Sequence, residues 1–212
     1  MKNLILIGGG GHCISVIDVI DDNEFNILGV LDLPHNVGQE VLGKKIIGTD
    51  ENIKDYVNSA HFVVTLGFLD NDPSPARRIT IYDKIRLLGG KFATIISPHA
   101  YVSKYAIIEE GAVVMHKACI SANAHIGKNC IINSFANIEH NCIIGDHTTI
   151  STGAMINGDC IVGSSVFIGS QCVLSDKVII PNNTIVGANS FVNRSLLSPG
   201  IYWGTPAKKV KN

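Results

Sequence analysis

The chain has 212 residues, with 17 Lys or Arg against 18 Asp or Glu, so its formal net charge at pH 7 is −1. Without a basic excess to neutralise phosphates, a nucleic-acid partner is not expected. No apolar run approaches the roughly 20 residues that cross a bilayer, and no signal-peptide cleavage pattern follows the first residues, so we expect no membrane insertion and a cytoplasmic location. The charged fraction of 17% is below the usual ~25%, which suggests that an oligomer hides part of the surface.

The first 92 residues alternate short apolar runs with stretches of helical spacing, a pattern typical of a small βαβ domain. Residues 4–7 predict a buried parallel strand, and the glycines 8–11 that follow predict a tight turn into a helix over 13–20. Further strands are expected at 27–31, 62–66 and 92–96, and a helix from Ser74-Pro75 to about Leu88. We therefore expect a Rossmann-like α/β domain over residues 1–92.

The glycine turn has the chemistry of a phosphate site, because Gly10 and Gly11 let the backbone approach a phosphate and the next helix presents free N–H groups. Cys13 stands where the dinucleotide fingerprint needs its third glycine, so a turn without a ligand is the alternative. Asp32 ends the next strand 22 residues after Gly10, near the spacing at which an acid meets a ribose hydroxyl. The binding crevice is expected at the glycine turn, Asp32 and Gly67, with room for a mononucleotide.

Residues 97–192 divide into sixteen blocks of six without an insertion or deletion. At about 3.3 Å per residue a block makes one short strand and a corner, so three blocks form one coil of a three-sided prism. Each block ends on an aliphatic residue that we expect to point inward, with a small or β-branched residue two places earlier. The aliphatic places are Val102, Ile108, Val114, Ile120, Ile126, Ile132, Ile138, Ile144, Ile150, Ile156, Val162, Ile168, Leu174, Ile180, Val186 and Val192. The small places include Cys130, Cys142, Cys160 and Cys172, which we interpret as buried small hydrophobes and not as ligands or disulfides.

One block carries a histidine in its outer part. Cys142 and Ile144 take the inward places of this block, so His140 is predicted to face solvent or a neighbouring subunit. Gly158 follows eighteen residues later, which is one full coil. Both residues are therefore expected on one edge of the prism, about 4.8 Å apart along its axis.

The repeat, together with the tail 200–209 (GIYWGTPAKK), resembles the hexapeptide-repeat acyltransferases. Their strands wind as a left-handed parallel β-helix, and they assemble as trimers with each active site between subunits. A small nucleotide-binding domain in front of such a prism resembles the NeuD/PglD-type sugar acetyltransferases over essentially the whole chain. The resemblance implies a nucleotide-sugar-binding domain at 1–92, a left-handed β-helix acetyltransferase domain at 93–212, a nucleotide-sugar substrate, acetyl-CoA as co-substrate, a homotrimer and no metal.

The same resemblance assigns roles to individual residues. The segment 139–145 (EHNCIIG) matches a family segment whose histidine is the general base, so His140 takes that role and the backbone N–H of Gly158 takes that of oxyanion donor. Asn141 stands where many relatives have Glu or Asp; its amide holds one ring tautomer but adds no charge. Thr149 stands where some relatives have a histidine that touches the acetyl group. The nucleotide sugar is expected at Gly10, Gly11, His12, Asp32, Leu33 and Gly67, and acetyl-CoA at Thr149, Gly158, Gly169, Ser170, Gly187 and Ala188.

Several functions stay open at this level. An amine suits a base without a neighbouring carboxylate, which favours N-acetylation of a nucleotide-linked amino sugar, with sialic-acid-type O-acetylation as the alternative. A non-catalytic trimer that binds nucleotide sugars is a further possibility. Zinc-dependent carbonic anhydrases share the prism, but no two of the four histidines considered are one coil apart, so convergence on one zinc ion within one chain is poor. A subunit interface could in principle supply the missing ligand. These histidines are His116, His125, His140 and His147.

Overall fold

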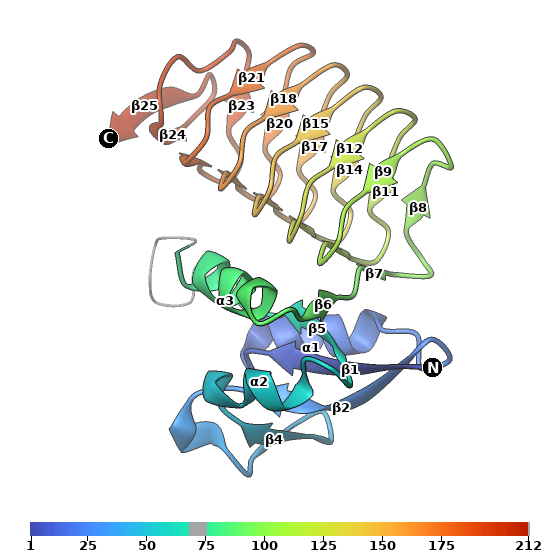
Figure 1. The fold of residues 1–212 in the computed structure, drawn as a ribbon. Coiled ribbons are helices and arrows are strands. Elements are labelled where there is room, and N and C mark those ends of the chain that lie inside the picture. Colours follow the sequence, from blue (N-terminus) through green and yellow to red (C-terminus); the bar gives the residue numbers. More distant parts are fainter. Residues whose placement is uncertain (68–75, 212) are drawn as a thin grey trace. The chain divides into compact units, whose positions relative to one another are not determined.

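The structure is a computed structural model, and it describes residues 1–67 and 76–211 (Figure 1). The chain divides into two compact units, Met1–Ile95 and Ile96–Asn212, which we call the α/β unit and the prism. Among the helices of the described residues, none has the length and apolar character that crossing a bilayer requires.

The α/β unit is built on a six-stranded sheet of order β3-β4-β2-β1-β5-β6. The apolar run of the sequence forms the middle of this sheet, where Leu4, Ile5 and Leu6 are fully buried between neighbours on both sides. All neighbouring strands pair in parallel except β3 with β4. The strands are β1 (Lys2–Ile7), β2 (Phe25–Leu31), β3 (Glu40–Val41), β4 (Lys44–Gly48), β5 (His61–Val64) and β6 (Lys91–Phe92), and the helices are α1 (Gly11–Val19), α2 (Ile53–Tyr56), α3 (Ala76–Leu87) and the 3₁₀ turns η1 (Pro34–Asn36) and η2 (Asp50–Asn52).

The strand predicted at 92–96 is two strands that belong to different sheets. Residues Lys91–Phe92 pair with β5 at the edge of the α/β sheet, whereas β7 (Ile95–Ile96) pairs with β10 as the first rung of the prism. The short β3–β4 hairpin was not predicted; its turn places Leu42, a residue that usually avoids this region, at a φ of 46°. The predicted helix start at Ser74-Pro75 lies outside the described residues.

Each six-residue block of the prism contributes one strand, and the strands stack in three parallel sheets. Pairing is in register with a spacing of eighteen residues, as between Cys119 and Asn137. The inward aliphatic residues and their small partners form one continuous core, as the period predicts. The strands are β8 (Tyr101–Val102), β9 (Ile107–Ile108), β10 (Val113–Val114), β11 (Cys119–Ile120), β12 (His125–Ile126), β13 (Ile131–Ile132), β14 (Asn137–Ile138), β15 (Ile143–Ile144), β16 (Thr149–Ile150), β17 (Met155–Ile156), β18 (Ile161–Val162), β19 (Phe167–Ile168), β20 (Val173–Leu174), β21 (Ile179–Ile180), β22 (Thr184–Val186) and β23 (Phe191–Val192).

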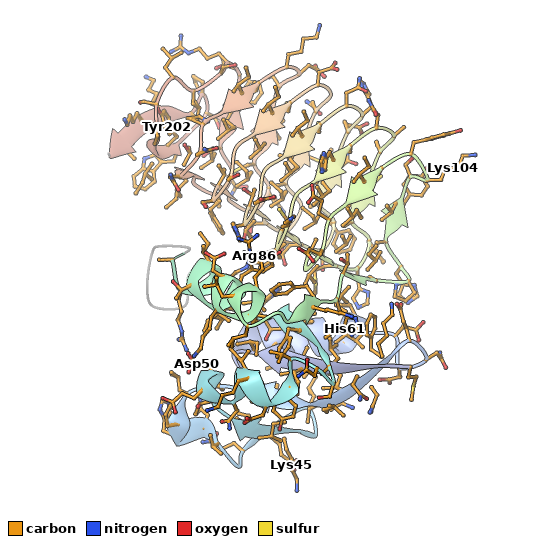
Figure 2. All side chains as sticks on the ribbon, viewed as in Figure 1. Lys45, Asp50, His61, Arg86, Lys104 and Tyr202 are labelled. Carbon is orange, nitrogen blue, oxygen red and sulfur yellow. The ribbon has the colours of Figure 1, made fainter. Side chains whose placement is uncertain are left out.

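Two further strands, β24 (Gly200–Trp203) and β25 (Lys208–Lys211), end the eight-stranded sheet of the prism. Strand β24 continues the parallel ladder from β22, and β25 folds back antiparallel on it. Tyr202 lies buried at this end of the prism (Figure 2), where its hydroxyl donates to the backbone carbonyl of Ser198 at 2.8 Å. The tail thus closes the last coil.

The corners of the prism need a left-handed backbone at the third place of every block from Gly111 to Asn189. Asn and Asp adopt this conformation more readily than other residues with a side chain. At one corner the residues of three successive coils are Asn123, Asn141 and Asp159, with φ between 59° and 62°. The backbone therefore gives a structural reason for an Asn at position 141.

The inward cysteines are buried and unpaired. Cys130, Cys142, Cys160 and Cys172 each donate an S–H to a corner carbonyl of a neighbouring block, at 2.8 to 3.1 Å. A hydrogen bond with Cys160, followed by burial, raises the pKa of Cys142, and burial raises that of Cys172. The burial of all four side chains confirms that these cysteines are small residues of the core.

Candidate active site

His140 lies at the corner between β14 and β15, where the six-stranded sheet of the prism meets its five-stranded sheet. We call this corner, with residues 139–141, 157–159 and their equivalents in other coils, the His140 edge. The imidazole is exposed, in keeping with its place in the block. Lys104, which holds the same place two coils earlier, also extends away from the prism (Figure 2).

Gly158 lies directly against the imidazole. A Cβ atom placed on Gly158 would lie 2.6 Å from Cε1 and 2.8 Å from Nε2 of His140, closer than real side chains approach. The ring therefore occupies the space that a side chain at position 158 would need. The carbonyl of Gly158 accepts from Lys177 in the next coil, whereas its N–H makes no backbone hydrogen bond within the described residues.

Three polar side chains of successive coils form a ladder beside the ring. Nδ2 of Asn123 donates to Oδ1 of Asn141, and Nδ2 of Asn141 donates to Oδ1 of Asp159, both at 2.9 Å. The same Nδ2 lies 3.2 Å from Nδ1 of His140. Asp159 was not predicted, although its place one coil after Asn141 is a signal that the sequence contains.

The acetyl-CoA residues predicted higher in the prism lie on a different edge. Gly169, Ser170, Gly187 and Ala188 lie at the corner between the eight-stranded and six-stranded sheets, and Thr149 is buried on β16 of the eight-stranded sheet. A Cβ atom on Gly169 would lie 2.5 Å from the backbone nitrogen of Ala188, so coil packing alone requires that glycine. Within a single chain, Gly158 is the one predicted acetyl-CoA residue that lies beside His140.

A cleft of about 240 Å³ opens in the α/β unit at the ends of β1 and β2. Asp32 and Leu33 line it, as do Asp50 (Figure 2) and Arg77, which were not predicted. The Asp32 carboxylate accepts from Nδ2 of Asn36 at 2.9 Å, which fixes its direction. Gly10, Gly11, His12 and Gly67 do not line this cleft.

The glycine turn at the start of α1 faces open space. Neither Gly10 nor Gly11 has a positive φ, and a Cβ atom on either would meet no atom of the described residues within 4 Å. Packing among the described residues therefore requires neither glycine, although Gly10 is the N-cap of α1, where glycine is favoured. Nε2 of His12 is buried without a hydrogen-bond partner among the described residues, and burial, helped by the charge of Arg78, lowers the pKa of His12 to about 4. A neutral ring with an unused nitrogen thus lies beside an uncovered stretch of backbone.

Models of known protein families match both units of the chain. Residues 93–200, which are 108 of the 212, match the family model described as the GMPPB C-terminal domain. Residues 3–85 match the PglD N-terminal domain. The chain belongs to the PglD-type sugar acetyltransferases of the hexapeptide-repeat superfamily. Enzymes of this group use acetyl-CoA.

Solved structures match almost the whole chain. PerB from Caulobacter crescentus, in complex with CoA and GDP-perosamine, is 28% identical with a TM-score of 0.90 over 99% of this chain and 98% of that one. The acetyltransferase domain of PglB from Neisseria gonorrhoeae, in complex with acetyl coenzyme A, is 26% identical with a TM-score of 0.89 over 99% of both chains. WeeI from Acinetobacter baumannii, at 19% identity over 99% of this chain and 100% of that one, shares the fold with a TM-score of 0.85. The matches confirm the predicted fold class, a Rossmann-like unit followed by a left-handed parallel β-helix.

A curated viral protein matches part of this acetyltransferase. The uncharacterized protein L142 of Acanthamoeba polyphaga mimivirus is 35% identical over 124 residues, which are 58% of this chain and 23% of that protein. The chain thus spans less than a quarter of that relative.

In the part of the chain that the structure describes, no three His, Cys, Asp or Glu side chains gather in a way that could hold a metal ion.

Proposed function

We propose that this acetyltransferase transfers the acetyl group of acetyl-CoA to an amino group of a nucleotide-linked sugar, with His140 as general base. The proposal rests on one observation: the exposed imidazole of His140 packs against Gly158, and the absence of a side chain at position 158 leaves room for the ring. PerB, the relative described above, is crystallised with CoA and a nucleotide-linked sugar, GDP-perosamine.

The chemistry follows from the residues of the His140 edge. The acceptor nitrogen attacks the thioester carbonyl carbon, and a ring nitrogen of His140 takes the proton that the acceptor loses. The new C–N bond forms while the carbonyl oxygen becomes an oxyanion, which the unused N–H of Gly158 stabilises. The C–S bond then breaks, and His140 returns the proton to the CoA sulfur. Asn141 adds no negative charge to the ring, which suits an amine acceptor better than a hydroxyl.

The α/β unit supplies the proposed nucleotide site. Phosphates would approach the open backbone at Gly10 and Gly11, where the free N–H groups at the start of α1 favour an anion. The unused Nε2 of His12 gains a partner from such a ligand. Asp32 and Leu33, directly after β2, would contact the nucleoside from the neighbouring cleft. Gly67, which follows the end of β5 at Val64, would be a further contact.

We further propose a homotrimer with active sites between subunits. His140 and the remaining predicted acetyl-CoA residues lie on different edges of one prism, so a complete site needs a second copy. The outward isoleucines of the five-stranded sheet, Ile107, Ile143, Ile161 and Ile179, are 41% to 58% exposed and offer an apolar contact for that copy. The proposed location is the cytoplasm, the compartment expected from the sequence.

The test is an acetyl-transfer assay that follows release of free CoA thiol with a panel of acceptors. We expect turnover with a nucleotide-linked amino sugar and loss of turnover in His140→Ala. Turnover with sialic acids alone would overturn N-acetylation and support O-acetylation as the reaction of this enzyme. Nucleotide binding without turnover on either class would instead make the protein a binding trimer.

A further inference from the structure

Asp159 extends the site around His140 by one coil. Its carboxylate Oδ1 accepts from Nδ2 of Asn141 at 2.9 Å, and that amide in turn reaches Nδ1 of the ring. The acid that many relatives carry directly after the histidine is therefore not simply missing from this chain. A carboxylate is present one coil further on, and it contacts the ring through an amide.

The carboxylate fixes which way the amide of Asn141 points. An ionised carboxylate only accepts hydrogen bonds, so the NH₂ group of Asn141 must face Asp159. The amide oxygen is then turned toward Asn123, whose Nδ2 donates to it at 2.9 Å. With both sides of the amide engaged, the second N–H of Asn141 is the one that points at His140.

The direction of this N–H decides where the neutral imidazole carries its proton. Nδ1 of His140, 3.2 Å from the amide nitrogen, can only accept from it, and a neutral ring that accepts at Nδ1 carries its hydrogen on Nε2. We propose that Asp159 is a positioning residue that, through Asn141, keeps the proton of neutral His140 on Nε2 and leaves the lone pair of Nδ1 to take the acceptor's proton.

This assignment deepens the proposed function and rests on it for the catalytic step. Nε2 lies nearer than Nδ1 to the place that a Cβ atom on Gly158 would take, at 2.8 Å against 3.3 Å. Nδ1 makes the long, exposed contact with Asn141 at 3.2 Å. A sugar amine can take the place of the amide at Nδ1. A directly adjacent carboxylate would have the opposite effect, because it would accept from Nδ1–H and leave Nε2 as the base.

Nitrogen NMR of the ring tests the assignment without any assay of activity. Protein labelled with ¹⁵N-histidine is recorded at alkaline pH, and the His140 signals are identified by their absence in His140→Gln. We expect the proton on Nε2 in the natural protein and a mixture of tautomers in Asp159→Asn, because an amide at position 159 lets Asn141 turn over. The matched control is Asp176→Asn, which removes an exposed acid from the same edge and should leave the ring unchanged.

A second variant separates positioning through Asn141 from a general effect of charge. Asn141→Gly keeps the left-handed backbone and removes the amide, so it should give the same mixture, and adding Asp159→Asn to it should change nothing further. A natural ring protonated on Nδ1 would overturn the proposal, as would an Asp159→Asn ring identical to the natural one.

Steady-state kinetics test whether Asp159 also affects the rate of acetyl transfer. Loss of a residue that orients a reacting group typically costs 10-fold or more, so Asp159→Asn should lower kcat about tenfold with unchanged KM values for both substrates. An unchanged kcat beside the expected NMR result would overturn the catalytic part of the proposal and keep the tautomer. Absence of acetyl transfer in the natural protein would overturn the proposed function, while the NMR result still decides the role of Asp159.

Discussion

The α/β unit and the prism use glycine for opposite reasons. In the prism, a Cβ atom on Gly169 would collide with the backbone of the next coil, and one on Gly158 would collide with the imidazole of His140 in the previous coil. In the α/β unit, a Cβ atom on Gly10 or Gly11 would meet no described atom within 4 Å, and neither residue has a positive φ. In the prism, glycine leaves room for atoms of a neighbouring coil, whereas in the α/β unit it leaves the backbone open at the place where we propose that a ligand binds. Substitutions should therefore damage geometry in the prism and binding in the α/β unit.

The largest effect is expected where the prism carries the chemistry. His140→Ala removes the proposed base and should lower kcat by about 10²–10⁴-fold, with little change in the affinity for CoA. Initial rates of thiol release and CoA titration measure the two quantities. An unchanged rate would remove His140 from the mechanism.

Gly158→Ala tests the packing side of the comparison. The added methyl would lie 2.6 Å from Cε1, so the exposed ring must move, and a displacement of about 1 Å at a reacting group costs roughly 100-fold in rate. The melting temperature should change little because the ring swings into solvent. An unchanged rate in Gly158→Ala, with the imidazole of His140 still in its original place, would show that glycine is not needed at position 158.

Gly11→Ala tests the ligand side. A methyl in open space at the first residue of α1 should raise helix stability by about 0.5–1 kcal/mol, because alanine loses less backbone entropy than glycine. The same methyl should weaken nucleotide-sugar binding, measured by calorimetry, and leave CoA binding unchanged. Equal nucleotide affinity in both proteins would favour a turn without a ligand.

The smallest effect concerns the stability of the α/β unit. Burial lowers the pKa of His12 from 6.5 to about 4, so between these values the unfolded chain binds more protons than the folded one. His12 therefore makes stability fall as the pH drops from about 6.5 to about 4. Thermal unfolding across this range should be less pH-dependent in His12→Gln, whereas His35→Gln, at an exposed histidine, serves as the control. If the melting temperature of His12→Gln fell with pH as steeply as that of the natural protein, the lowered pKa of His12 would be contradicted.

The sequence predicts the prism far better than the α/β unit. Because coil spacing is eighteen residues throughout, residues far apart in the chain, such as His140 and Gly158, can be paired by counting. The α/β unit has no such rule: Asp50 and Arg77 reach the cleft from η2 and α3, and their meeting with Asp32 depends on packing that the pattern does not encode. The strand expected at 92–96 shows the same limit, since its two halves pair with different sheets.

Asp159 is an intermediate case. Its place beside Asn141 follows from the coil spacing, but the resemblance to relatives directed attention to the residue that follows the histidine and not to the next coil. The contact also depends on the left-handed corner, which turns both side chains outward along one ladder. Corner conformation is what the block pattern leaves unspecified.

A crystal structure with CoA and a nucleotide-linked amino sugar tests the central claim most directly. The account predicts the CoA sulfur and the sugar amine together beside His140 and Gly158, with the nucleotide in an α/β unit. CoA bound at another face, or a His140 edge that a neighbouring subunit covers completely, would contradict it.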